Sequence, residues 1–263
     1  MPVRSDRKPG ILERLKRGVV LGDGGYILEL ERRGYVQAGP YTPEVAVEHP
    51  GAVRQLHEEF LRAGSDVLQA LTFYASRDKL ATAGYGGQME AINRAAVRIA
   101  REVAGEQALV AGTLCVTWQY RPGSAEARAR VRRLFDEQIV LQAAEGVDFF
   151  ICETLHYVGE GILAAKAITQ AGYPAMITLN FKGTEQSQDG HSPEEVARIL
   201  IGEGADIVGA NCGRDPARML PIVEKMRKAV KRGYSPRSRR PTAPARTSPT
   251  SWAGPSFRSS WIR

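Results

Sequence analysis

Short apolar runs alternate along this chain with longer segments whose apolar residues recur at helical spacing. The short runs have the length of buried strands, and they predict strands at Val19–Leu21, Val67–Leu71, Ala108–Ala111, Phe149–Ile151, Ala175–Leu179 and Ile207–Gly209. The longer segments predict helices at Ala91–Val103, Ala125–Ala144, Gly161–Ala171 and Pro193–Ile201. The last of these follows Ser192, a residue type that caps helix N-termini, and has proline at its first position.

Several predicted helices end at a glycine that leads into the next strand. Gly146, Gly172 and Gly204 each stand in such a loop, where the left-handed backbone conformation that ends many helices costs glycine nothing. Repeated strand-helix-glycine units predict an α/β fold with a parallel sheet covered by helices. Six such units are compatible with either a doubly wound sheet or a barrel.

Polar residues at the ends of the predicted strands favour the barrel. Asp23, Thr72, Thr113, Glu153, Asn180 and Cys212 each lie at or just past the carboxyl end of a strand. In a barrel these ends converge on one mouth, which is where the active sites of such folds lie. The glycines around Asp23 lack the spacing of a dinucleotide-binding loop. We therefore expect a (β/α)8 TIM-type barrel, incomplete here at about six βα units.

The net charge of +7 comes from the end of the chain. Residues 232–263 hold seven arginines and no lysine or acidic residue, whereas residues 1–231 hold 29 basic and 29 acidic residues. We therefore divide the chain into a partial barrel at 10–231, with no electrostatic reason to bind nucleic acid, and a Pro/Arg/Ser-rich tail at 232–263. The tail has three interpretations: a disordered basic extension, a nucleic-acid-binding arm, or a frame-shifted translation of the end of the barrel.

The overall composition is that of a globular, cytoplasmic protein. The chain is 43% hydrophobic and contains no apolar run long enough to span a bilayer, so no membrane partner is expected. Its three cysteines, Cys115, Cys152 and Cys212, are too few and too scattered for a disulfide framework. The sequence does not decide between a monomer and a homo-oligomer.

Several segments, taken in order, resemble the homocysteine S-methyltransferase family. They are Gly22-Asp23-Gly24-Gly25, Leu71 to Ser76, Cys152-Glu153-Thr154, Gly209 to Cys212, Arg33 to Glu44, and Glu48-His49-Pro50. The stretch GDGGYILELERRGYVQAGPYTPE is particularly similar to the betaine-dependent members. The resemblance runs from about Gly10 to about Lys228, and it implies a barrel enzyme that transfers a methyl group to homocysteine.

The resemblance also implies a zinc ion and a homocysteine site. Family members hold Zn²⁺ with three cysteines, which lowers the pKa of the bound substrate thiol. Cys212 matches the first of these ligands, while the Gly-Gly-Cys-Cys-Gly segment that supplies the other two is absent. Asp23 and Gly24 match positions that contact homocysteine. Glu153 matches a position suited to the ammonium group of that substrate.

The methyl donor of this family carries a quaternary ammonium or sulfonium centre, which aromatic ring faces attract. Tyr41, Phe73 and Tyr74 match the family's donor-binding region. Tyr41 stands where betaine enzymes have tryptophan, Ala70 replaces a threonine, and Thr154 replaces an aromatic residue. We expect betaine as the donor, with methionine and dimethylglycine as products. A sulfonium donor such as S-methylmethionine, or a catalytically inactive fragment of the family, are the alternatives.

The four histidines do not form a metal-binding or catalytic spacing. His49 and His57 lie before or on a predicted helix, and His156 and His191 are far from them in the sequence. We interpret His49 and His57 as surface or capping residues and assign no catalytic role to any of the four.

Overall fold

The computed structural model describes residues 8–36, 43–181, 183 and 185–231. Tyr41 and the tail at 232–263 lie outside the described residues. None of the described helices combines the length and apolar character required to cross a membrane. In chain order, the elements are α1 (Ile11–Arg17), α2 (Tyr26–Arg32), α3 (Val45–Glu48), α4 (Pro50–Arg62), β1 (Val67–Gln69), α5 (Arg77–Ala81), the 3-10 helix η1 (Gly86–Gln88), α6 (Met89–Ala104), β2 (Leu109–Cys115), α7 (Ala125–Ala144), β3 (Phe149–Leu155), α8 (Val158–Gln170), β4 (Ala175–Leu179), α9 (Pro193–Gly202), β5 (Ile207–Ala210) and α10 (Pro216–Lys231).

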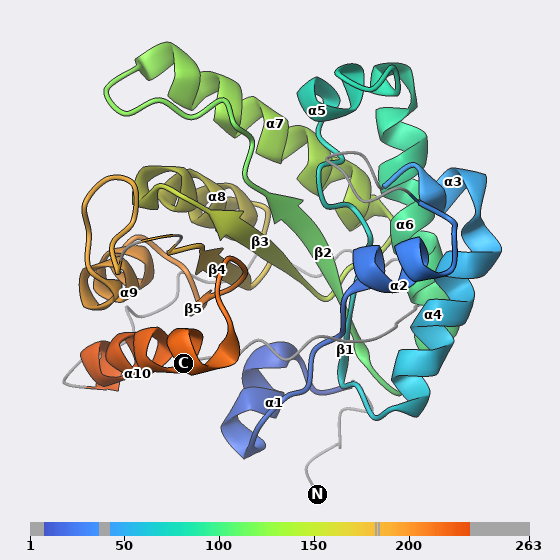
Figure 1. Cartoon of the computed structure of the whole chain (residues 1–263), viewed down its shortest axis with the longest axis horizontal. Coiled ribbons are helices and arrows are strands. Elements are labelled where there is room, and N and C mark those ends of the chain that lie inside the picture. The colour runs from blue at the N-terminus through green and yellow to red at the C-terminus, as the bar shows by residue number, and fades with distance from the viewer. Residues whose placement is uncertain (1–7, 37–42, 182, 184, 232–263) are drawn as a thin grey trace, which may run out of the picture.

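The five strands form one parallel sheet in the order β1-β2-β3-β4-β5. Each strand pairs with the next along the chain, and the paired positions include Val67 with Leu109, Ala111 with Phe149, and Met176 with Ile207. A doubly wound sheet would reverse its strand order at a switch point, and this sheet does not. Figure 1 shows the larger helices arranged around the curved sheet. The fold is therefore a partial TIM-type barrel, as the sequence predicts.

Alternate residues of the strands pack on opposite faces of the sheet. One set faces α1, which covers the amino ends of the strands, and packs in a cluster with Ile11 and Val20: Val67, Leu109, Ala111, Phe149, Ile151, Met176 and Ile207. The intervening residues, such as Leu68, Val110, Phe150 and Ile177, pack in the main core, which also contains residues of the surrounding helices. Because the strand period is two, the first set defines the inner face of the barrel.

Most of the predicted elements are confirmed to within a few residues. The strand Ala175–Leu179 and the helix Ala125–Ala144 have the predicted bounds. At the start of α9, the Ser192 hydroxyl accepts a hydrogen bond from the backbone of Glu195, whose carboxylate accepts one from the Ser192 backbone, which completes a capping box.

Two predictions about the strands are wrong. Val19–Leu21 forms no regular strand, so the described sheet has five strands where six units are expected. This glycine-flanked segment makes a single bridge at Asp23, and its Leu21 carbonyl accepts from the backbone N–H groups of Asp66 and Val67. Thr113 and Glu153 do not lie past a strand end, because β2 continues to Cys115 and β3 continues to Leu155.

Candidate active site at the carboxyl ends of the strands

Four non-glycine residues near the carboxyl ends of the strands adopt the left-handed backbone conformation. They are Tyr74 after β1, Trp118 after β2, Thr154 near the end of β3, and Cys212 after β5, with φ of 62°, 62°, 60° and 57°. This conformation is uncommon for residues with a side chain, and such strain tends to gather where a structure positions functional groups. The barrel mouth is therefore the candidate site.

Glu153 is held from two directions at this mouth. It follows Phe149 and Ile151 at alternate positions of β3, so it belongs to the inner face of the barrel. Its Oε1 accepts a hydrogen bond from Gln69 Nε2, and its Oε2 accepts one from Asn211 Nδ2 at 2.8 Å. Burial raises the pKa of Glu153 to about 7, although the hydrogen bond from Gln69 opposes that rise. The carboxyl group thus titrates near neutral pH.

Asp23 is a second buried carboxyl group, and Gln69 connects it to Glu153. Asp23 Oδ2 accepts from the Gln69 backbone N–H at 2.5 Å and from the Tyr26 hydroxyl at 2.7 Å. Burial raises the pKa of Asp23 well above its usual value, and the charge of Glu153 adds to this effect. Within the described part of the chain, no lysine, arginine or histidine forms an ion pair with either carboxylate. The two carboxyl groups therefore form an acidic pair without a cation of their own.

Asn211 connects this acidic pair to Cys212. The Asn211 Oδ1 atom accepts from the Thr154 backbone N–H at 3.0 Å and from the Thr178 hydroxyl at 2.8 Å. Its Nδ2 lies 3.4 Å from the Cys212 sulfur, as well as donating to Glu153. Desolvation raises the pKa of the Cys212 thiol, and the charge of Glu153 raises it further. The amide thereby fixes the position of an exposed thiol relative to the carboxylate.

Gly213 allows the loop after Cys212 to pass close to β4. Its φ is +70°, and a Cβ atom built there would lie 2.5 Å from Asn180 Oδ1. A side chain at this position would meet both backbone strain and a clash. Glycine is therefore required for this path of the loop.

The described residues do not complete a metal site. They contain no group of three or more histidine, cysteine, aspartate or glutamate side chains that could hold a metal ion. Cys212 is exposed, whereas Cys115 and Cys152 are buried, and Cys152 packs in the main core. The zinc ion that the family resemblance implies thus has one candidate ligand here, which does not fit a three-cysteine site.

Two of the three expected donor-binding residues lie in the described part of the chain, next to each other between β1 and α5. The rings of Phe73 and Tyr74 have centroids 4.4 Å apart and are tilted by 52°. The Tyr74 backbone N–H donates to the Cys115 sulfur at 3.1 Å. This bond connects the loop to the carboxyl end of β2. Gly24 lies between Asp23 and α2, and its carbonyl accepts from the Tyr26 backbone at 2.9 Å.

The prediction that His57 is a surface or capping residue is wrong. The side chain is 0% exposed, and its Nδ1 lies 2.6 Å from the Tyr26 hydroxyl. Burial lowers the pKa of His57 to about 3, so the ring is neutral. The Tyr26 hydroxyl thus connects the buried His57 ring to the Asp23 carboxyl group. In contrast, His49 is exposed and makes no side-chain capping bond at the start of α4.

Sequence reasoning gave no positioning role to four residues around the carboxylates, namely Gln69, Asn211, Tyr26 and His57. Gln69 follows Val67 at the next inward position of β1, so strand alternation offered a signal for it. Tyr26 stands three residues after Asp23, a spacing that indicates little by itself. The burial of His57 depends on how α4 packs against α2, which a single helix pattern does not reveal.

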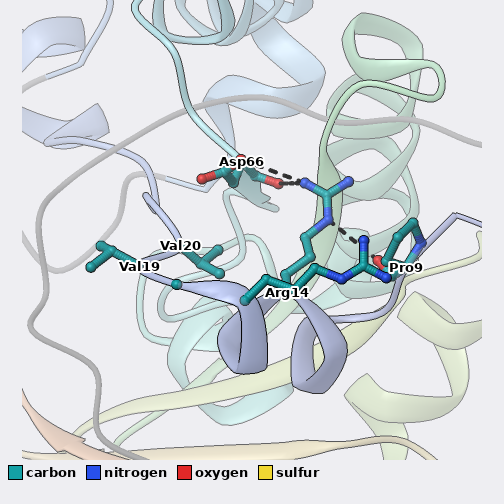
Figure 2. Close-up of a pocket in the computed structure, with 7 residues that line it drawn as sticks. Pro9, Arg14, Val19, Val20 and Asp66 are labelled. Atoms are coloured by element: carbon teal, nitrogen blue, oxygen red, sulfur yellow. Dashed lines mark hydrogen bonds and ion pairs between the residues drawn. The ribbon is translucent and has the colours of Figure 1, made fainter.

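A separate cavity of about 330 Å³ lies at the amino ends of the strands, and Figure 2 shows residues that line it. The Arg14 guanidinium donates to the Pro9 carbonyl at 3.3 Å and to the Asp66 carbonyl at 3.2 Å. Val19 and Val20 form part of the wall. This cavity is at the end of the barrel opposite to Glu153 and shares no residue with the candidate site.

Comparison with known proteins assigns the family. The sequence profile described as homocysteine S-methyltransferase matches residues 20–257. Betaine–homocysteine S-methyltransferase 1 from Rattus norvegicus is 47% identical over 231 residues, which cover 85% of this chain and 56% of the rat protein. The Sus scrofa protein of that name is 46% identical, over 85% of this chain and 81% of the pig protein. The chain thus spans a little over half the length of several curated relatives that it matches.

A solved structure supports the fold. The metallated form of the homocysteine methyltransferase MmuM from Escherichia coli superposes with a TM-score of 0.65 at 23% identity, covering 76% of this chain and 77% of that one. At this identity the likeness shows a shared fold. Together with the profile match and the mammalian relatives, it leads to one assignment: the chain belongs to the homocysteine S-methyltransferase family.

Proposed function

We propose that this chain binds homocysteine at the barrel mouth and transfers a methyl group to its sulfur, with betaine as the donor. The observation that carries the proposal is the pair of carboxyl groups, the buried Asp23 and the partly buried Glu153, which Gln69 connects and which no described cation neutralises. Two such groups are costly to ionise without a partner. An amino-acid substrate with an ammonium group supplies that partner.

Substrate binding is expected to change the protonation of Glu153. With a pKa of about 7, the empty site holds this group partly protonated at neutral pH. The ammonium group of homocysteine favours the ionised form and lowers that pKa, so binding releases a proton to solvent. Gln69 and Asn211 hold the two carboxylate oxygens in place, which fixes the orientation of the amino-acid end of the substrate.

The transfer is a displacement at a methyl carbon. The homocysteine thiol releases its proton to solvent, and the resulting thiolate, which is the nucleophilic form, forms the new S–C bond. The N–C bond of betaine breaks, and its electron pair stays on nitrogen, which gives methionine and dimethylglycine. The described residues contribute by holding acceptor and donor in line, which is worth several kcal/mol in such reactions. Phe73 and Tyr74 are the described residues proposed to contact the donor.

None of these steps involves zinc, because the described residues do not form a complete zinc site. A bound zinc ion would lower the pKa of the substrate thiol. Cys212 is the one residue that we propose as a ligand, since it is exposed at the mouth and next to Asn211.

The test follows the methyl group directly. The purified chain is incubated with L-homocysteine and betaine carrying deuterated methyl groups, and deuterated methionine is measured by mass spectrometry. A parallel reaction uses S-methylmethionine with a deuterated methyl group. Labelled methionine from betaine is the expected result, reduced in Glu153→Gln and unchanged in Glu126→Gln, whose side chain is at the exposed start of α7.

Two outcomes would reject the proposal in different ways. If only S-methylmethionine gives labelled methionine, the donor is a sulfonium compound and not betaine. No label from either donor, with a folded protein, would identify the chain as an inactive member of its family.

A further inference from the structure

The ammonium group of Lys79 lies against two aromatic rings at the barrel mouth. Its Nζ is 4.6 Å from the centroid of the Tyr74 ring and 5.6 Å from that of the Trp118 ring. Both distances are within the range of a cation–π contact. The two rings come from the loops after β1 and β2. They therefore flank one cation from two different elements.

Trp118 is held in an exposed position rather than packed in the core. It is 46% exposed, its φ is +62°, and its ring centroid is 5.1 Å from that of His156, beyond the end of β3. The preceding residue fixes the loop: the buried Glu160 carboxylate accepts from the Thr117 backbone at 2.9 Å and from the Thr117 hydroxyl at 2.5 Å. The fold thus presents a large aromatic ring to solvent on a strained backbone.

Tyr74 is fixed beside it in a similar way. Its backbone N–H donates to Cys115 at 3.1 Å, and its φ is also +62°. Burial raises the pKa of the Tyr74 phenol, and a hydrogen bond with the Trp118 side chain opposes that rise. Because Lys79 Nζ lies within cation–π distance of both rings, we refer to Tyr74 and Trp118 together as the ring pair.

We propose that Trp118 is a specificity-determining residue of the donor site, where the ring pair binds the methylated onium group of the donor in place of Lys79. The inference rests on the proposed transfer from an onium donor and names a residue that the sequence did not single out. An aromatic residue is missing at Thr154, and Trp118 supplies a ring at the same mouth.

The exchange of one cation for another is physically favourable. A lysine ammonium is compact and strongly hydrated, so it loses much hydration against a ring. A quaternary ammonium or sulfonium has no polar hydrogen to donate and binds well to ring faces. Lys79 sits on a flexible four-carbon stem at α5 and is only partly buried, so it can return to water when the donor enters.

Tetramethylammonium is the probe that tests the ring pair, with its affinity for the full chain measured by isothermal titration calorimetry. Trp118→Ala is expected to weaken binding by about 5- to 30-fold, the range of a desolvated cation–π contact. Trp118→Phe should restore part of that loss. Lys79→Met should tighten binding by about 2- to 5-fold, because no resident cation then has to leave the ring pair.

Tyr35→Ala is the matched control, since Tyr35 is another exposed aromatic residue, 41% exposed, whose ring centroid lies 5.3 Å from that of His49 before α4. The control should bind the probe as the wild type does. Unchanged affinity in Trp118→Ala, or weaker binding in Lys79→Met, would overturn the inference.

The probe separates this inference from the proposed function because it binds without reacting. If methyl transfer fails while the binding of tetramethylammonium depends on Trp118, the reaction is rejected and the cation site stands. If deuterated methionine forms from betaine with the same donor KM in Trp118→Ala, the reaction stands and the role of Trp118 is rejected.

Discussion

Replacing Glu153 with glutamine should make the protein more stable at alkaline pH while weakening the binding of homocysteine. The side chain keeps its shape, and the Gln69 amide can turn over to accept from the new amide group while Asn211 still donates to the other atom. What disappears is the cost of ionising a desolvated carboxyl group at this position. A gain in stability together with a loss in binding marks a group that the fold retains for function.

The size of the stability effect follows from the pKa. Glu153 titrates at about 7 in the folded chain against 4.5 for its ordinary value, and one unit corresponds to about 1.4 kcal/mol. The folded state therefore binds the proton more tightly than the unfolded state between these two values. The free energy of unfolding of the wild type falls by about 3 kcal/mol as pH rises through that window, and the loss is complete above pH 7.

Urea unfolding at pH 5 and pH 8 measures this difference. The comparison of wild type with Glu153→Gln reports the titration of Glu153 together with its effect on the pKa of Asp23, which the charge of Glu153 raises. The variant should lack most of the wild-type decrease of about 3 kcal/mol, and the control Glu126→Gln should show all of it. Parallel pH profiles of wild type and Glu153→Gln would refute the placement of an unneutralised carboxyl group at the mouth.

Two further predictions concern groups around the site. Tyr26→Phe leaves His57 Nδ1 buried without its 2.6 Å partner and should lower the free energy of unfolding by about 1–3 kcal/mol; the exposed control Tyr35→Phe should not, and equal unfolding midpoints would contradict the reasoning. Iodoacetamide should modify Cys212 before the other two cysteines, which are buried and have raised pKa values. Peptide mass spectrometry gives the order, and simultaneous modification of all three would show that the mouth is not the exposed region.

The repeating part of the fold is predictable because local and tertiary signals agree there. The run Ala175–Leu179 follows a glycine-containing loop and is apolar except for Thr178, so it predicts a buried strand, and the structure buries it on both faces. Val19–Leu21 is apolar throughout, but Val19 is 87% exposed and the segment forms no strand, with a single bridge two residues further on at Asp23. Whether such a short run becomes a strand depends on the chain beside it, which its own residues do not encode.

The site is predictable in its charged residues and less so in the groups that hold them. Asp23 and Glu153 stand out because they end apolar runs, and the structure connects them through Gln69. Their raised pKa values depend on burial by other elements. Trp118 carries no sequence signal, because its exposure and its approach to Lys79 result from loops that meet only in the folded barrel.

The most direct test of the central claim compares L-homocysteine with 4-mercaptobutanoate, which has the same thiol and carboxylate but lacks the ammonium group. Calorimetry on the full chain measures both affinities at pH 8, where Glu153 is ionised. If Asp23 and Glu153 bind the ammonium group, L-homocysteine should bind at least about tenfold more tightly, as expected for a charge-assisted hydrogen bond, and Glu153→Gln should remove most of that preference. Equal binding of the two thiols to the wild type would contradict the account.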